Sequence, residues 1–108
     1  MTFIIASLIS LFLALPALAA DITMGANGNL AFDPKELTVS VGEVVTLTNG
    51  DLPPHNFVVD GHPEFSHSDL AFASGDSFTV TFDQAGDYNF QCEPHAGAGM
   101  TGIIHVTE

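Results

Sequence analysis

The chain has 108 residues, thirteen of them Asp or Glu and a single one, Lys35, a Lys or Arg. Its length predicts one domain, and its formal net charge of −12 argues against binding to nucleic acid or to an anionic lipid surface, because both would repel it. The same acidity suits attraction to a basic partner or simply solubility in a salty medium, and charge alone does not separate these two interpretations.

Residues 1–20 carry no charged side chain and contain an apolar run from Phe3 to Leu15, followed by small residues. A short apolar run that ends in an A-x-A pattern is typical of a cleavable secretion signal, and it is shorter than the ~20 residues of a transmembrane helix. We therefore expect a signal peptide over residues 1–19 and a folded domain over residues 20–108. A retained anchor is the alternative, because no basic residue precedes the apolar run.

The rest of the chain contains short runs in which apolar and polar residues alternate. Turn-forming residues separate these runs at intervals of ~8–12 residues, a spacing that predicts an antiparallel β-sandwich or barrel. The stretch from Gly61 to Ser74 is less regular, and a helical turn is expected near Ser68–Phe72. The alternating, β-branched or aromatic runs are 37–41, 45–48, 56–60, 78–82, 88–92 and 102–107.

The only cysteine of the chain, Cys92, ends one of these runs, on the same predicted inward face as Tyr88 and Phe90. An odd cysteine in an exported protein suggests an intermolecular bridge, a reactive thiol or a metal ligand. The alternative is a buried cysteine that packs as a small hydrophobic side chain. The residues around Cys92 decide between these interpretations.

The loop that begins at Cys92 reads CEPHAGAGM and adds His95 and Met100. A thiolate, an imidazole and a thioether are soft ligands that select copper, whereas zinc gains little from the thioether. One more histidine would complete a His₂Cys centre with a weak axial methionine, the arrangement of blue-copper electron-transfer sites. Because such a site leaves no coordination position open for a substrate, we expect an electron carrier and not an enzyme.

His55 is the best candidate for the remaining ligand, because it follows Pro53-Pro54 and directly precedes a predicted strand. The neighbouring Asn56 can hydrogen-bond to the cysteine loop and tie the two segments together. Three further histidines lie in the irregular segment or in the last strand and fit less well: His62, His67 and His105. The predicted copper ligands are therefore His55, Cys92, His95 and Met100.

Four segments of the chain strongly resemble plastocyanin, and its cyanobacterial branch in particular: GANGNLAFDP, LPPHNFVVDG, DLAFASGDSF and CEPHAGAGM. The spacing Cys-x₂-His-x₄-Met is shared with pseudoazurins and by itself indicates only a cupredoxin. The PHN motif, PHAGAGM and an end directly after the last predicted strand favour plastocyanin, because pseudoazurins carry extra C-terminal helices. The resemblance covers essentially all of residues 20–108.

This resemblance implies an eight-stranded antiparallel Greek-key β-sandwich of the cupredoxin type that binds one copper ion. It implies a monomer that carries electrons from cytochrome f of the cytochrome bf complex to photosystem I, through transient and electrostatically steered contacts. The expected location is the thylakoid lumen, or the periplasm. The edge of His95 would be the electron exit, surrounded by an apolar patch at Leu30, Pro54, Gly97 and Ala98.

Two positions, one directly before the copper loop (Cys92 to Met100) and one within it, depart from the plastocyanin pattern. Gln91 stands where plastocyanins usually have a tyrosine directly before the copper cysteine, and Ala96 stands where cyanobacterial members often have an arginine. The first departure removes the side chain of a proposed remote contact with redox partners, which leaves His95 as the main route. The second removes a positive charge that could meet a partner.

Three other functions fit parts of the sequence. A related cupredoxin would donate electrons to a terminal oxidase or another periplasmic acceptor. Whether the host has photosynthetic machinery would distinguish this carrier from a plastocyanin. A copper delivery protein would need exposed, exchangeable ligands, whereas this site is expected to be enclosed. A copper enzyme would need a second, histidine-rich site, and the chain has no His-x-His pair.

Overall fold

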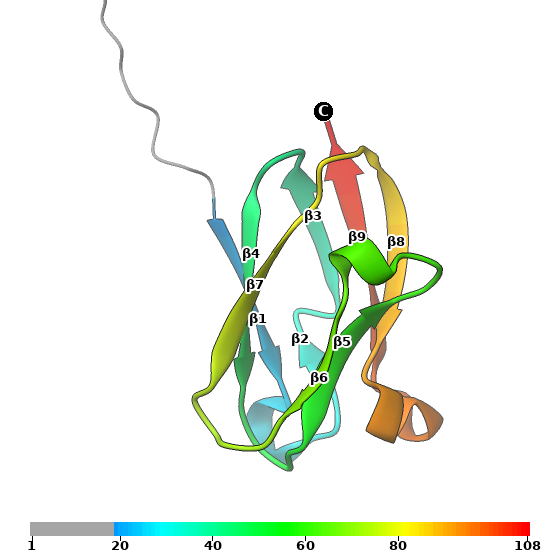
Figure 1. The fold of residues 1–108 in the computed structure, drawn as a ribbon. Helices are drawn as coiled ribbons and strands as arrows, with labels where there is room; N and C mark the ends of the chain where they lie inside the picture. The colour runs from blue at the N-terminus through cyan, green and yellow to red at the C-terminus, as the bar shows by residue number, and fades with distance from the viewer. Residues whose placement is uncertain (1–18) are drawn as a thin grey trace, which may run out of the picture.

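The computed structural model describes residues 19–108, which form two β-sheets packed face to face (Figure 1). The predicted signal peptide, 1–19, lies outside the described residues except for Ala19, which begins the first strand. No helix within the described residues is long and apolar enough to cross a membrane. The elements are β1 (Ala19–Met24), η1 (Ala26–Gly28), β2 (Phe32–Asp33), β3 (Glu36–Ser40), β4 (Val44–Asn49), β5 (His55–Val59), η2 (Pro63–Phe65), β6 (His67–Ala71), β7 (Ser77–Thr81), β8 (Gly86–Gln91), η3 (Glu93–Ala98) and β9 (Thr101–Thr107).

One sheet has the strand order β2-β1-β4-β7 and the other the order β3-β9-β8-β5-β6. The predicted cupredoxin-like β-sandwich is confirmed, with nine described strands in place of eight, one of them the two-residue β2. Most pairs are antiparallel, but β1 pairs with β4 and β3 pairs with β9 in parallel. Alternation along a strand specifies which face is buried and not the direction of the neighbouring strand, so the sequence did not reveal these two pairs.

The core lies between the two sheets and contains two groups of aromatic rings. At the end of the sandwich where β5 begins, Phe90 packs against Phe32 and Phe57, with ring centroids 4.8 Å apart in both pairs. The second group, nearer the other end, consists of Phe65, Phe82 and Tyr88. Full burial of a phenylalanine side chain stabilises a fold by about 1.5–3 kcal/mol, so these rings hold the two sheets together.

The segment predicted to hold a helical turn near Ser68–Phe72 is instead the edge strand β6, so that prediction is wrong. It runs antiparallel to β5, with Ala71 opposite His55 and a register shift before the next paired residue. The ring of His67 stacks on Phe78 of β7 at a centroid distance of 3.8 Å, which joins the free edges of the two sheets. Pairing with β5 and this stacking determine the structure of a segment whose local pattern is irregular.

A small charged cluster crosses three neighbouring strands of the second sheet. His105 of β9 contacts Asp87 of β8 through Nδ1 at 2.7 Å and Glu36 of β3 through Nε2 at 2.8 Å. A neutral imidazole has one N–H, so both ring nitrogens donate to carboxylates only when the ring is protonated. The hydrogen bonds that His105 donates to the carboxylates of Asp87 and then Glu36 accordingly raise its pKa.

The substitution His105→Gln tests this cluster. Because the pKa of His105 is higher in the folded than in the unfolded chain, its stabilising effect is complete below about pH 6.5 and is lost as the pH rises through the folded-state pKa. We expect the melting temperature of wild type to exceed that of His105→Gln slightly at about pH 6 and to equal it at about pH 9. The difference should be small because an exposed ion pair contributes little to stability. Thermal unfolding followed by circular dichroism measures both.

The substitution Asp87→Asn is the matched control for this prediction. It keeps the histidine and removes the first of its two acidic partners. The melting temperature of Asp87→Asn should therefore depend on pH less than that of wild type but more than that of His105→Gln. A difference between wild type and His105→Gln that stays constant with pH would contradict the role given to the protonated ring.

Candidate metal centre

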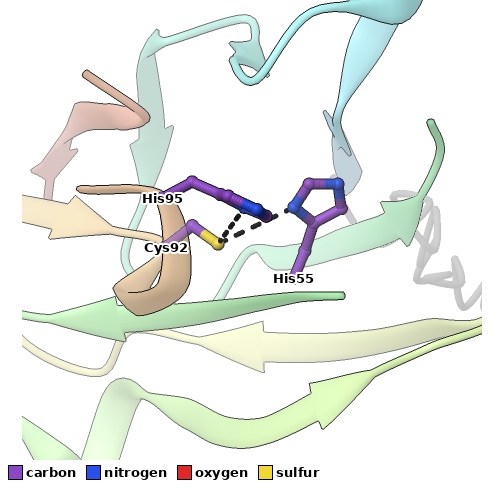
Figure 2. A group of neighbouring side chains, drawn as sticks. All are labelled: His55, Cys92 and His95. Atoms are coloured by element: carbon purple, nitrogen blue, oxygen red, sulfur yellow. Dashed lines mark hydrogen bonds between the residues drawn. The ribbon is translucent and has the colours of Figure 1, made fainter. Parts of the chain in front are cut away.

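Three potential metal ligands meet at one end of the sandwich, where three segments of the chain converge. His55 is the first residue of β5, Cys92 directly follows β8, and His95 lies in η3. Their ligand atoms all lie within 4.8 Å of one another, and Figure 2 shows the two imidazole rings turned toward the sulfur. His55 and Cys92 are fully buried, whereas His95 is half-buried. The predicted convergence of these three side chains is therefore present in the fold.

The spacing of these atoms fits a bound metal ion. Sγ of Cys92 lies 3.7 Å from Nδ1 of His55 and 3.6 Å from Nδ1 of His95. A metal with bonds of about 2.0 Å to nitrogen and about 2.3 Å to sulfur, meeting at about 120°, separates sulfur from nitrogen by about 3.7 Å. The two sulfur-to-nitrogen distances therefore match those expected around one bound ion, and the thiolate and imidazole donors suit copper.

The orientation of the His55 ring is fixed by a backbone carbonyl. Nε2 of His55 lies 2.6 Å from the carbonyl oxygen of Asp51, which can only accept, so Nε2 carries the proton. Nδ1 is then the unprotonated nitrogen, and it is the atom that faces Cys92. A hydrogen bond of this kind from the second ring nitrogen fixes both the tautomer and the ring orientation of a metal ligand.

The Asp51 carbonyl is itself held in place from the β1 side. The Asp51 amide donates to the Gly25 carbonyl at 2.8 Å, and the Asp51 carboxylate accepts a hydrogen bond from the Gly28 amide at 2.9 Å. Gly25 has a φ of +81°, and a Cβ built there would collide with the Asp51 carbonyl oxygen and with Nε2 of His55. A glycine at this position is therefore required for the close approach of the two segments.

The copper loop closes on itself through backbone hydrogen bonds. The amide of His95 donates to the Cys92 carbonyl at 3.1 Å, the amide of Met100 to the His95 carbonyl at 3.2 Å, and the amide of Cys92 to the Met100 carbonyl at 3.1 Å. Within this loop, Glu93–Ala98 form the 3₁₀ turn η3. Met100 is fully buried directly after this turn.

Asn56 joins the His55 strand to the Cys92 loop, as predicted. Its buried side chain accepts a hydrogen bond from the Glu93 amide at 2.8 Å and donates to the Glu93 carboxylate at 3.0 Å. Its amide also donates to the Ser68 carbonyl of β6 at 3.0 Å. One side chain therefore sets the positions of β5, β6 and η3 relative to one another.

Burial raises the pKa of the Cys92 thiol above its usual range. A thiol in such an environment keeps its proton and is a poor nucleophile, whereas metal coordination requires the thiolate. A cation at this position would supply the positive charge that favours the deprotonated form. The buried cysteine thus suits a metal ligand better than a reactive thiol.

The other histidines lie away from this group and have contacts of their own. His62 contacts Glu64 at 2.9 Å, His67 stacks on Phe78, and His105 lies in its acidic cluster. In the part of the chain that the structure describes, the only group of three or more His, Cys, Asp or Glu side chains with metal-binding spacing is His55, Cys92 and His95.

Sequence reasoning missed two residues that shape the site, Gly25 and Asp51. Their roles depend on the approach of the β1–η1 turn to the loop before β5, and this contact joins segments some 25 positions apart in the chain. Neither residue carries a sequence signal of its own, since glycine and aspartate are both common in turns.

Comparisons with known proteins agree with this geometry. The sequence matches the family described as "Copper binding proteins, plastocyanin/azurin family" over residues 19–107. A chloroplastic plastocyanin of Tetradesmus obliquus is 44% identical over 87% of this chain and 71% of its own length, and a plastocyanin of Nostoc punctiforme is 44% identical over 73% and 66%. Oxidised plastocyanin from Dryopteris crassirhizoma has a similar structure, with a TM-score of 0.71 and 33% identity over 81% of this chain and 99% of that chain.

A β-sandwich with a His₂Cys group at one end defines the class of cupredoxins. Within that class, the chain belongs to the plastocyanin/azurin family of copper-binding proteins. The plastocyanin resemblance seen in the sequence is confirmed. Copper is the cofactor of the chain, and the chain is a blue-copper electron carrier.

The substitution Gly25→Ala tests the support of His55, with Gly28→Ala as its matched control. Both glycines have positive φ, so each alanine should cost about 1 kcal/mol for the left-handed backbone. Nothing lies within 4 Å of a Cβ at Gly28, whereas a Cβ at Gly25 meets Asp51 and His55. Gly25→Ala should therefore lower the free energy of unfolding by about 1–3 kcal/mol more than Gly28→Ala.

Urea unfolding of the two variants measures this difference, and the visible spectrum of the Cu(II) protein provides a second readout. We expect the spectrum of Gly25→Ala to change and that of Gly28→Ala to stay as in wild type. Equal losses of stability together with two unaltered spectra would contradict the support of His55 by the close approach at Gly25.

Proposed function

We propose that His55, Cys92, His95 and Met100 bind one copper ion in a type 1 site, and that the chain shuttles single electrons from cytochrome f to photosystem I. The observation that carries the proposal is the convergence of one buried thiol and two imidazoles with metal-binding spacing at one end of a rigid sandwich. Met100 would be the fourth residue to hold the ion, because it is fully buried and its backbone is hydrogen-bonded to both Cys92 and His95.

Copper, when bound, supplies the chemistry by taking up and releasing one electron. The protein residues keep the ligands in place during this change: Asp51 holds the His55 ring, and Asn56 holds the strand of His55 against the Cys92 loop. A site that changes little between two oxidation states has a low barrier to electron transfer. No ligand position is left for a substrate, so the chain acts as a carrier and not as an enzyme.

His95 is the proposed electron exit, because it alone among the three converging ligands is not fully buried. The apolar patch expected around it is supported by the exposure of Gly97 and Ala98 and by the partial exposure of Leu30 and Pro54. A small, uncharged contact area lets a partner approach the metal closely and keeps the complex weak, as rapid turnover requires.

We further propose that residues 1–19 are a signal peptide and that residues 20–108 work as a monomeric domain in the thylakoid lumen or an equivalent periplasmic space. The apolar run and its A-x-A ending support export, and the plastocyanin relatives support the partner pair of cytochrome f and photosystem I. The acidic surface supports steering toward partners with basic docking faces.

The substitution Cys92→Ser tests the site assignment. Wild-type protein loaded with Cu(II) should show an intense blue thiolate-to-copper band and a narrow copper hyperfine splitting, and Cys92→Ser should lose both. Ser68→Ala is a suitable control, because Ser68 is exposed and contributes only its backbone carbonyl near the site. A pale, ordinary Cu(II) spectrum for wild type would refute the proposal.

Met100→Leu separately tests the assignment of Met100 as a ligand. Leucine fills a similar volume without a donor atom, so we expect the blue band to remain and the reduction potential to rise, because Cu(II) depends more than Cu(I) on the additional ligand. Cyclic voltammetry of wild type and variant measures the potential. An unchanged or lowered potential would contradict the assignment of Met100 as a ligand.

The negative charge predicts how association depends on salt. The second-order rate constant for oxidation of the soluble domain of cytochrome f should fall about tenfold or more between low and physiological ionic strength, because screening weakens the attraction to a basic docking face. Stopped-flow kinetics measure this rate, with an uncharged hydroquinone as the control reductant. A rate with cytochrome f that is independent of salt would exclude electrostatic steering.

A further inference from the structure

Glu93 is held at two points beside the segments that carry the metal ligands. It directly follows Cys92 in the chain and is the first residue of η3. Its backbone amide donates to Oδ1 of Asn56 at 2.8 Å, and its carboxylate accepts a hydrogen bond from Nδ2 of Asn56 at 3.0 Å. Asn56 in turn directly follows the ligand His55 in β5. The Glu93 carboxylate therefore has a fixed place next to both ligand segments.

The Asn56 side chain that anchors this carboxylate is itself fixed. It is buried, and its second N–H donates to the Ser68 carbonyl of β6 at 3.0 Å, so both of its N–H groups and its oxygen have partners. Rotation of this amide would leave buried polar groups unpaired, which is costly. The negative charge of Glu93 consequently stays close to the metal centre, although the residue is exposed to solvent.

The Cys92 sulfur lies within reach of this charge. Burial is the main reason why the pKa of the Cys92 thiol is raised, and the negative charge of Glu93 raises it further. Glu93 is also the one acidic residue of the copper loop, 92–100. The Asp51 carboxylate, near His55, is bonded to the Gly28 amide and so is tied to η1 instead. Glu93 is thus the carboxylate fixed on the sulfur side of the site.

A fixed negative charge at this place favours the more positive state of the site. With a thiolate ligand, the site is one unit of charge more positive with Cu(II) than with Cu(I). By Coulomb's law, a nearby carboxylate stabilises the first state more than the second. The reduction potential, which measures the preference for Cu(I), falls as a result.

We propose that the Glu93 carboxylate lowers the reduction potential of the copper site through its fixed negative charge. Asn56 is the positioning residue that keeps the carboxylate beside the ligands. This inference rests on the proposed function, because it concerns the one copper ion that His55, Cys92 and His95 would hold. A carrier with this charge gives up its electron more readily to an acceptor and takes one less readily from a donor.

The substitution Glu93→Gln tests this inference, with Asp83→Asn as the matched control. Glutamine keeps an oxygen that can accept from Asn56 and loses the charge. Asp83 is exposed in the turn between β7 and β8, at the end of the sandwich opposite the metal centre (Figure 1). Spectroelectrochemical titration measures the ratio of Cu(I) to Cu(II) at one applied potential. Glu93→Gln should raise this ratio about threefold at low ionic strength, and Asp83→Asn should leave it nearly as in wild type.

Salt and the blue band separate an effect of charge from a change of geometry. The difference between wild type and Glu93→Gln should shrink as salt is added, because mobile ions screen a charge that is exposed to solvent. The blue band should keep its position and intensity in Glu93→Gln, because the substitution leaves the ligands in place.

Equal ratios for Glu93→Gln and Asp83→Asn, with intact blue bands, would overturn the role of Glu93 and leave the carrier function standing. An altered blue band in Glu93→Gln, or a difference from wild type that does not depend on salt, would also overturn it, since the effect would then come from the geometry of the ligands. A wild type that shows no blue band would overturn the proposed copper site and this inference together.

Discussion

The hydrogen bonds of the Asn56 side chain are the interaction on which the metal centre depends most. The ligands come from positions 37 residues apart, and Asn56 joins the two segments by contacting both the amide and the carboxylate of Glu93. Loss of this buried side chain would leave the Glu93 amide without this partner, at a cost of about 1–3 kcal/mol, and would remove the side-chain link between the Cys92 loop and β5. Together with the carbonyl of Asp51, the Asn56 side chain fixes where His55 and Cys92 lie relative to each other.

The rest of the sandwich divides its tasks between its interior and its surface. The ring of Phe90, two residues before Cys92, packs against Phe57, two residues after His55, so the core directly supports both ligand-bearing strands. The charged side chains are nearly all acidic, and most of them lie on the surface. The end near His95 has apolar side chains. Long-range attraction and close contact are thus assigned to different atoms, which suits brief complexes with rapid dissociation.

The sequence predicted the sandwich and the convergence of His55, Cys92 and His95 because both depend on local patterns. Alternation marks the inward face that ends at Cys92, and CEPHAGAGM and the Pro53-Pro54 pair mark the two ligand segments. It did not predict β6, whose side chains are mostly exposed at a sheet edge and so carry no alternation, nor the parallel pairs, which depend on how the sheets are connected. Gly25 and Asp51 were missed because their contact forms only when distant turns meet.

The single lysine has a practical consequence. Lys35 is exposed at the start of β3, and its carbonyl accepts a hydrogen bond from the Ile103 amide of β9, shortly after the copper loop. Amine-directed chemistry on side chains therefore has one target in the whole chain. A dye coupled to Lys35 would therefore lie near the metal centre, with the β6 edge on the far side of the sheet. The composition thus limits side-chain amine coupling to one known point on the molecule.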